Sequence, residues 1–143
     1  MTDICAAMGL VQLERYEEML ERRREIIRRY DACCEALGLK HLIHSTDTMY
    51  SSAHLYLIRN PKWKEEERNA AISALAELGI ATNVHYKPLP MFTAYLALGW
   101  DIRDFPNAYD YYKSLISLPL YSKLSMEDVD YICQGLKQVV GEC

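Results

Sequence analysis

The stretch Thr82-Asn83-Val84-His85-Tyr86-Lys87-Pro88-Leu89-Pro90 is the part of this sequence from which we interpret the rest. Its first residues predict a short buried strand, and its last residues predict a stiff loop. Pro88 lacks a backbone N–H and moves Lys87 out of the helical region, and Pro90 does the same to Leu89. We therefore expect three polar side chains at a strand end, where ligand-binding loops are common. A rigid turn with an aromatic plug is the other interpretation that the pattern allows.

Length and composition indicate one ordinary globular domain. The chain has 143 residues, of which 50% are hydrophobic and 25% are charged, which is enough for a real core. The net charge of -4 argues against a nucleic-acid partner, because such a partner requires a basic face. No apolar run approaches the length of a membrane span, and Met1 to Ile4 lack the features of a signal peptide. We expect a cytoplasmic protein without a membrane partner.

The cysteines and histidines do not predict a metal centre. The cysteine count of five is odd, so we expect reduced thiols and not a disulfide framework. The cysteines are Cys5, Cys33, Cys34, Cys133 and Cys143. Cys33 and Cys34 are adjacent and lack zinc-ligand spacing. His41 and His44 lie three residues apart in a polar loop. A small metal or redox protein built on these histidines and the cysteines is one interpretation, although the ligand spacing is missing.

The N-terminal region predicts one long helix over residues 3–37, which Gly38 ends. Its apolar stripe is expected at helical spacing, and the stripe consists of Leu13, Tyr16, Leu20, Ile27, Tyr30, Cys34 and Leu37. The first turns differ, because Ile4 to Val11 leave almost no polar face. A helix that is apolar all round requires burial on all sides. We therefore expect another domain or a partner subunit to cover these turns.

The remaining pattern predicts an α+β domain with a small sheet covered by helices on one face. Residues 41–52 are turn-like. Strands are expected at 53–58, 80–84 and 115–118. Helices are expected from Asn60-Pro61 to Leu78, over 91–100 as a short helix or turn, over 105–113, and after the capping box that begins at Ser125. The pattern alone does not fix the strand directions.

His85, Tyr86 and Lys87 are the residues that we expect to contact a ligand. A tyrosine hydroxyl can donate a hydrogen bond to a phosphate or a sugar hydroxyl, and a lysine can pair with a phosphate. His54 lies in a predicted strand and reads as a structural histidine. The chain contains no glycine-rich phosphate loop, no His-Glu-x-x-His and no Gly-x-Ser-x-Gly.

Four stretches together carry a resemblance to a known family. They are Met1–Leu13, Ala53–Arg59, Gly79–Leu89 and Ser117–Val129. In order and spacing they resemble the C-terminal part of the DegT/StrS family, whose members are pyridoxal-phosphate-dependent aminotransferases that act on nucleotide-linked keto sugars. The products of such enzymes enter polysaccharides and antibiotic sugars.

The resemblance implies a small C-terminal domain of the fold type I aminotransferases, with a mostly antiparallel sheet of about three strands. It implies a connecting helix over residues 1–38 and the small domain over 39–143. Such enzymes are homodimers, with sites at the subunit interface. The lysine that binds pyridoxal 5'-phosphate lies in the large domain, and no stretch here matches its segment. We therefore expect no catalytic residue in this chain, no tight cofactor binding by it, and no activity of the fragment alone.

The resemblance also implies a role for the central loop and leaves alternatives open. His85 and Tyr86 match the family's His-Tyr loop near the mouth of the active site. Many members have a histidine where Pro90 to Phe92 stand here, so the contact made by that histidine is not expected. Some relatives use the scaffold to dehydrate a keto sugar. A stand-alone interaction or regulatory module without catalysis is the other alternative.

Overall fold

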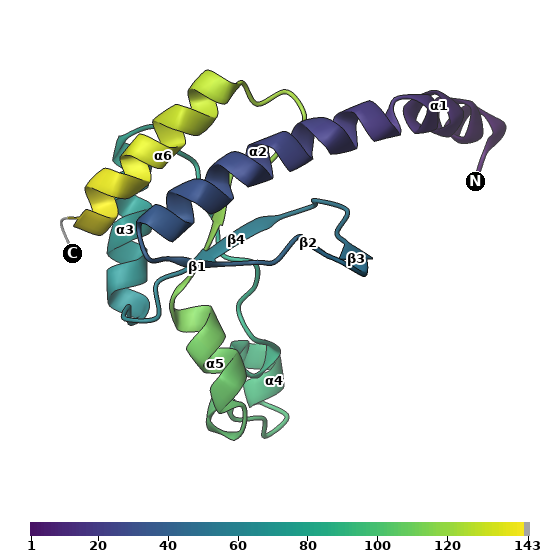
Figure 1. The fold of residues 1–143 in the computed structure, drawn as a ribbon. Helices are drawn as coiled ribbons and strands as arrows, with labels where there is room; N and C mark the ends of the chain where they lie inside the picture. The colour runs from purple at the N-terminus through teal and green to yellow at the C-terminus, as the bar shows by residue number, and fades with distance from the viewer. Residues whose placement is uncertain (142–143) are drawn as a thin grey trace.

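A three-stranded antiparallel sheet lies at the centre of the fold (Figure 1). The structure is a computed structural model, and it describes residues 1–141. The sheet has the order β1-β4-β5, with β1 at Lys40–His41, β4 at Tyr56–Arg59 and β5 at Leu115–Leu118. In this register Tyr56 pairs with Leu118 and Arg59 pairs with Leu115. The α+β class with a small antiparallel sheet is therefore confirmed.

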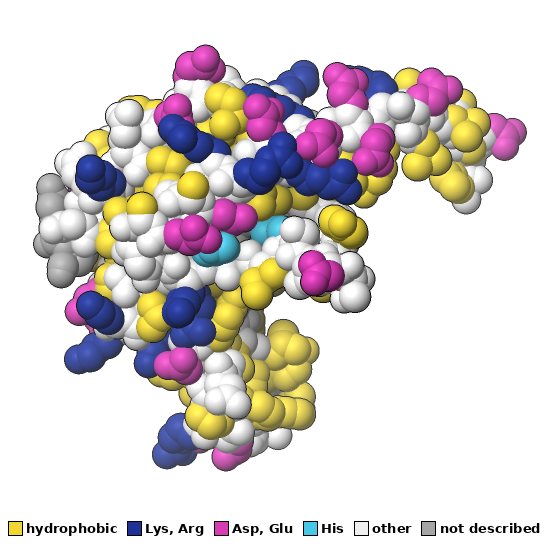
Figure 2. Space-filling model, in the orientation of Figure 1, with side chains coloured by type: hydrophobic (Ala, Val, Ile, Leu, Met, Phe, Trp, Pro, Cys, Tyr) yellow, Lys and Arg dark blue, Asp and Glu magenta, His cyan; other side chains and the backbone are white. Residues whose placement is uncertain are grey.

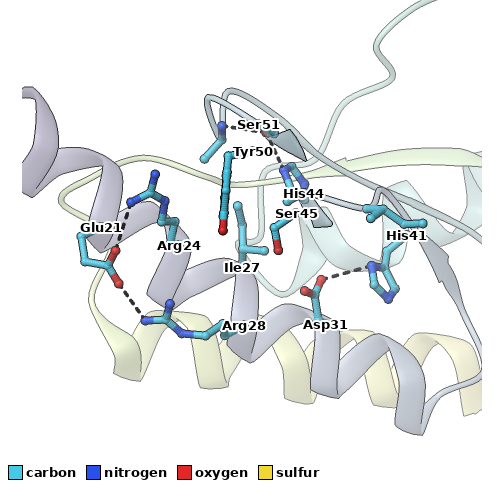
Figure 3. Close-up of a pocket in the computed structure, with 12 residues that line it drawn as sticks. Glu21, Arg24, Ile27, Arg28, Asp31, His41, His44, Ser45, Tyr50 and Ser51 are labelled. Carbon is cyan, nitrogen blue, oxygen red and sulfur yellow. Dashed lines mark hydrogen bonds and ion pairs between the residues drawn. The ribbon is translucent and has the colours of Figure 1, made fainter. Parts of the chain in front are cut away.

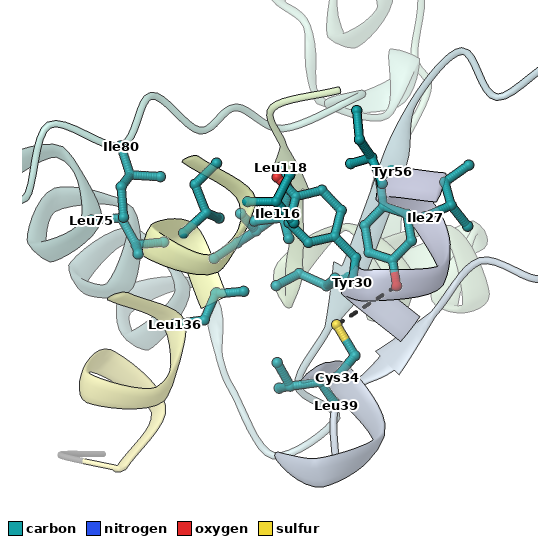
Figure 4. Close-up of a cluster of buried hydrophobic side chains, with 14 of the residues drawn as sticks. Ile27, Tyr30, Cys34, Leu39, Tyr56, Leu75, Ile80, Ile116, Leu118 and Leu136 are labelled. Atoms are coloured by element: carbon teal, nitrogen blue, oxygen red, sulfur yellow. Dashed lines mark hydrogen bonds between the residues drawn. The ribbon is translucent and has the colours of Figure 1, made fainter. Parts of the chain in front are cut away.

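Helices α2 (Tyr16–Ala36), α3 (Glu65–Glu77) and α6 (Met126–Gly141) cover one face of this sheet. Alternate residues of β4, Tyr56 and Ile58, are fully buried beneath them. Figure 4 shows how side chains from the helices and the sheet meet there. The core includes Ile27, Tyr30, Cys34, Leu75, Ile116, Leu118 and Leu136. Most of the stripe expected for the first long helix is buried, although Leu13 and Tyr16 are exposed and Ile26 joins the core unexpectedly.

The last helix begins as its sequence predicts. The backbone N–H of Asp128 donates to the Ser125 hydroxyl at 3.0 Å, which satisfies one of the free donors at the helix start. The predicted stripe of Val129, Ile132, Leu136 and Val139 is buried. Gly135 lies on the same side, where its Cα approaches α3 and the residues that follow it.

A second group of short helices extends beyond the end of the sheet (Figure 1). It contains the 3-10 turns η1 (Leu89–Met91) and η2 (Ile102–Asp104), and the helices α4 (Thr93–Leu96) and α5 (Pro106–Lys113). Arg59 of β4 connects α5 to the sheet through its side chain. Its guanidinium donates to the Ser114 hydroxyl at 3.0 Å and to the Asp110 carbonyl at 2.8 Å, and it lies 4.5 Å from the centre of the Tyr111 ring.

The predicted helix over 3–37 is in fact two helices. Helix α1 (Asp3–Glu14) ends at Arg15, where the backbone N–H reaches Gln12 and Leu13 instead of continuing the regular pattern. The axis changes direction there (Figure 1). No proline or glycine stands at this position, so the break could not be predicted from the residue types. Thr2 caps the start of α1, where its hydroxyl accepts a hydrogen bond from the Cys5 N–H.

Three other predicted boundaries were wrong. The strand expected at 53–58 begins at Tyr56. Residues 80–84 do not form a strand, because only Asn83 pairs with β5, through a single bridge to Ser117. Asn60 does not begin a helix. Its side chain accepts from Lys62 and its carbonyl from Trp63, which makes a turn, and α3 begins at Glu65 with the Lys64 N–H held by Glu67.

The residues expected to be turn-like contain a hairpin. Strands β2 (Ser45–Thr46) and β3 (Met49–Tyr50) form a two-stranded sheet apart from the main one. Both strands are exposed, so they lack the apolar alternation by which a strand is recognised.

The surface of α1 is apolar and uncovered in this structure. No residue of α1 is buried, and yellow side chains gather along it in Figure 2. The exposed fractions of Ile4 and Met8 are 75% and 65%. Among the described residues, no helix combines the length and hydropathy that a membrane span requires.

Candidate functional site

His85 is held in place by the neighbouring strand. Its Nδ1 lies 2.7 Å from the hydroxyl of Ser117, and the Ser117 backbone exchanges hydrogen bonds with Asn83 at 2.7 and 3.3 Å. Ser117 is buried, and Tyr56 on the adjacent strand pairs with the residue after Ser117 and points toward the helices. Because successive side chains of a strand point to opposite faces, Ser117 and the His85 ring that it holds lie on the other face of the sheet. With Nδ1 engaged, the Nε2 atom of His85 remains for a ligand, since no protein partner for it is found within residues 1–141.

Tyr86 and Lys87 follow His85 on the surface. The Tyr86 ring meets the His85 ring edge-on at 4.7 Å and is 72% exposed. The Lys87 amine lies 5.4 Å from the centre of the Phe92 ring, a distance at which a cation is attracted to an aromatic face. The structure therefore gathers the three predicted residues at one place, and it leaves their polar atoms accessible.

The three residues line a groove of about 580 Å³ between the loop and α5. The opposite wall is mainly apolar and includes Ala108, Tyr111, Tyr112 and Leu115. Pocket surfaces of this kind, mostly apolar with a few polar groups, are typical of small-molecule sites. Ser117, Tyr111 and Tyr112 were not predicted as site residues. The tyrosine-rich sequence of the α5 segment could have indicated Tyr111 and Tyr112.

The buried guanidinium of Arg68 packs against Tyr112 of this wall. Arg68 is only 2% exposed, lies 4.7 Å from the centre of the Tyr112 ring and pairs with Glu65 at 3.4 Å. The Tyr112 hydroxyl donates to Glu65 at 2.9 Å. Burial raises the pKa of Tyr112, so this hydroxyl stays protonated as a donor.

A second pocket lies between α2 and the hairpin on the helix-covered side (Figure 3). Its volume is about 520 Å³. Glu21 joins Arg24 and Arg28 along one rim, and these two hydrogen bonds lower the pKa of Glu21. Deeper in the pocket, Asp31 pairs with His41 at 3.1 Å and accepts from the Tyr56 hydroxyl at 2.6 Å.

His44 lies in the same pocket and is neutral near pH 7. Its ring stacks on Tyr56 with centroids 5.5 Å apart, and its Nδ1 lies 2.9 Å from the Ser51 hydroxyl. Burial lowers the pKa of His44. The two predicted loop histidines therefore meet at Tyr56. Within residues 1–141, however, no group of three His, Cys, Asp or Glu side chains is arranged to hold a metal ion.

The described lysines do not have the surroundings of a lysine that binds pyridoxal phosphate. A lysine that forms a Schiff base requires desolvation or a cationic neighbour. Every lysine of residues 1–141 is exposed or half-exposed, and Lys113 is paired with Asp110 at 2.8 Å. The lysines of residues 1–141 therefore do not fit the role of the Schiff-base lysine.

Comparison with known proteins gives a consistent result. The model of the DegT/DnrJ/EryC1/StrS aminotransferase family matches residues 1–137. The structures of Spr1654 from Streptococcus pneumoniae, described as a candidate sugar aminotransferase, superpose with a TM-score of 0.95 at 49% identity, over 99% of this chain and 36% of theirs. They include forms with pyridoxal phosphate and with pyridoxamine phosphate.

Curated relatives agree with the structural comparison. The spore coat polysaccharide biosynthesis protein SpsC from Bacillus subtilis is 36% identical over 98% of this chain. The UDP-4-amino-4,6-dideoxy-N-acetyl-β-L-altrosamine transaminase from Campylobacter jejuni is 32% identical over 98% of this chain. In both cases this chain spans only 37% of the relative's length.

Proposed function

The chain belongs to the DegT/DnrJ/EryC1/StrS aminotransferase family, and we propose that it forms the small C-terminal domain of a pyridoxal-phosphate-dependent aminotransferase for a nucleotide-linked keto sugar. The observation that carries the proposal is the match of 99% of the chain to a candidate sugar aminotransferase at a TM-score of 0.95. In this proposal residues 1–38 connect to the rest of the enzyme and residues 39–143 form the small domain, and α2 of the connecting part also packs in the core of that domain.

In this proposal the groove beside the central loop contributes to the substrate side of the active site. His85, fixed by Ser117 at 2.7 Å, offers Nε2 to a sugar hydroxyl or a phosphate oxygen. Tyr86 donates a hydrogen bond, and Lys87 contributes positive charge near the nucleotide's phosphates. The tyrosines of α5 supply the apolar wall against which a sugar ring can pack.

The cofactor, which supplies the electron sink for amino-group transfer, is proposed to bind to residues outside this chain. Two observations support this division. The described lysines are all accessible to solvent, and the chain spans 36% of the solved relative that binds the cofactor. The isolated chain is then inactive, and its small-domain groove is one part of a composite site.

Helix α1 is proposed to dock against the missing part of the active homodimer. Its apolar residues are uncovered, and Ile4, Met8 and Val11 share one face because they recur at helical spacing. Burying each side chain contributes about 1.5–3 kcal/mol, which is enough for a few residues to hold two parts together.

A chimeric enzyme tests the proposal. Residues 1–143 replace the matching C-terminal part of the Campylobacter jejuni transaminase, and activity is measured in the reverse direction. The amino sugar named for that enzyme is the amino donor, and a 2-oxo acid is the acceptor. We expect the chimera to retain the cofactor and to turn over substrate, whereas the N-terminal part of the transaminase alone should not turn over substrate. A soluble chimera that binds the cofactor and is as inactive as this N-terminal part alone would contradict the proposal.

Two further variants of the chimera make the result specific. Ile4→Asp with Met8→Asp places charge on the docking face and is expected to abolish assembly. Leu13→Asp places the same charge on an exposed residue on the opposite side of the same helix and is expected to leave assembly intact. Equal effects of both changes would show that α1 does not dock through its apolar face.

A further inference from the structure

Two cysteines far apart in the sequence face each other where α2 packs on α6. Cys33 and Cys133 are 100 residues apart, and the Cys33 thiol lies 3.9 Å from the backbone carbonyl of Cys133. The two helices run side by side (Figure 1). Both residues pack against the edge of the hydrophobic core and are only partly buried. They are outside the groove at His85 and outside the pocket at His44.

The two thiols also lie on an open groove, so a small molecule can reach them. This groove has a volume of about 470 Å³, and Arg29, Cys33, Asp130, Cys133 and Lys137 are among its lining residues. Arg29 pairs with Asp130 at 2.6 Å at its rim. A reagent with a polar or charged body can therefore be accommodated beside the sulfur atoms.

The surroundings make the two thiols chemically unequal. A hydrogen bond from the Cys133 thiol lowers the pKa of Cys33, and the Arg29 guanidinium adds to this effect. The same hydrogen bond raises the pKa of Cys133. A thiolate is the nucleophile in thiol–disulfide exchange, and it needs access to the attacked sulfur. Because Cys33 also lines the open groove and lies 3.9 Å from the Cys133 backbone, we expect it to attack first, with Cys133 as its partner.

Cys34 provides an internal contrast. It is the next residue along α2, but its side chain is fully buried in the core. Burial raises its pKa to about 12. Its thiol is thus protonated and inaccessible under conditions in which Cys33 reacts.

We propose that Cys33 and Cys133 form a modification site that takes a low-molecular-weight disulfide and becomes an intramolecular disulfide between α2 and α6. In the first step the Cys33 thiolate attacks one sulfur of the small disulfide, and one thiolate leaves with the electron pair of the broken S–S bond. In the second step Cys133 loses its proton and attacks the Cys33 sulfur, and the second small thiolate leaves. Two protein thiols are oxidised, and one small disulfide is reduced to two thiols.

The test uses the purified chain with Cys5→Ser and Cys143→Ser, which leave Cys33, Cys34 and Cys133 as the only cysteines, and glutathione disulfide as the probe. After digestion with trypsin, we expect the peptide of residues 30–40 to be linked to the peptide of residues 124–137. Fragmentation of this pair should place the link on Cys33 and not on Cys34. The intact mass should fall by two hydrogens, and a reducing agent should restore it.

Single substitutions separate the two steps. With Cys133→Ser, the reaction should stop at a glutathione adduct on Cys33. With Cys33→Ser, adduct formation should be at least tenfold slower. A persistent adduct on Cys33 in the presence of Cys133, a link through Cys34, or equal rates for the folded and the urea-unfolded chain would each overturn the proposal.

Discussion

Replacing Gly135 with alanine tests how closely α6 approaches the residues that follow α3. A Cβ atom at this position would lie 2.5 Å from Cδ1 of Ile80 and 3.3 Å from Cδ1 of Leu78. Carbon atoms normally approach to about 3.5–4.0 Å, so the Ile80 side chain must move by about 1 Å. Ile80 is 3% exposed and is surrounded by core residues, so it has little free space.

Two opposing effects set the magnitude. Overpacking a core costs about 1–3 kcal/mol, whereas alanine is favoured over glycine inside a helix by about 0.8–1 kcal/mol. We therefore expect Gly135→Ala to lower the free energy of unfolding by about 1 kcal/mol. Urea denaturation followed by circular dichroism measures the change.

A double-mutant cycle isolates the contact itself. Ile80→Val removes the Cδ1 atom and alone costs about 0.5–1.5 kcal/mol. In the Gly135→Ala background the same change relieves the clash, so we expect a coupling energy of at least about 1 kcal/mol. Additive effects, within about 0.5 kcal/mol, would refute this reasoning. Gly9→Ala is the control, because no atom lies within 4 Å of its Cβ position, and it should not destabilise the chain.

Three other predictions concern the core, the second pocket and α1. Tyr56→Phe removes a buried hydroxyl that donates to Asp31 at 2.6 Å and should cost about 1–3 kcal/mol; an unchanged urea midpoint would argue against that hydrogen bond. Burial lowers the pKa of His44, so the unfolded chain takes up its proton first. Stability should therefore fall as the pH drops through about 6.5, and His44→Gln should reduce this fall whereas His54→Gln, on an exposed residue, should not. Ile4→Asp with Met8→Asp should reduce self-association of the isolated chain in sedimentation velocity, and equal association by the unsubstituted chain and the variant would contradict the docking role of α1.

The sequence predicted those elements whose pattern is carried by buried residues. Val129, Ile132, Leu136 and Val139 recur at helical spacing and are buried in α6. Leu115 to Leu118 form a fully buried strand, as the apolar run predicts. In both cases burial imposes a periodicity that can be read directly.

The wrong boundaries occur where hydrogen bonding, and not burial, determines where a helix or strand begins and ends. Asn83 makes the only bridge in the expected strand 80–84, so the segment lacks the repeated backbone hydrogen bonds of a strand. Asn60 could cap a helix, but it closes a turn that places Trp63 in the core. The exposed hairpin at residues 45–50 has no apolar pattern at all.

The site was predicted in part for similar reasons. Prolines and polar residues marked the loop of His85, Tyr86 and Lys87, and the structure gathers them on one groove. Ser117 was not identified, because the residue that holds His85 lies 32 positions away along the chain. A contact of that kind depends on the bridge between Asn83 and Ser117 of β5, which the sequence pattern did not predict.

The central claim is that this chain supplies the substrate side of an aminotransferase site and that the cofactor binds elsewhere. The most direct measurement compares the chimeric enzyme with its His85→Ala variant, with His54→Ala as the control. The account predicts that His85→Ala lowers kcat/KM for the nucleotide sugar by about tenfold, or about 1.4 kcal/mol. The amount of bound cofactor, and the rate at which the cofactor reacts with the other, non-sugar substrate, should stay unchanged. An unchanged kcat/KM, or loss of the cofactor in the His85→Ala variant, would contradict the account.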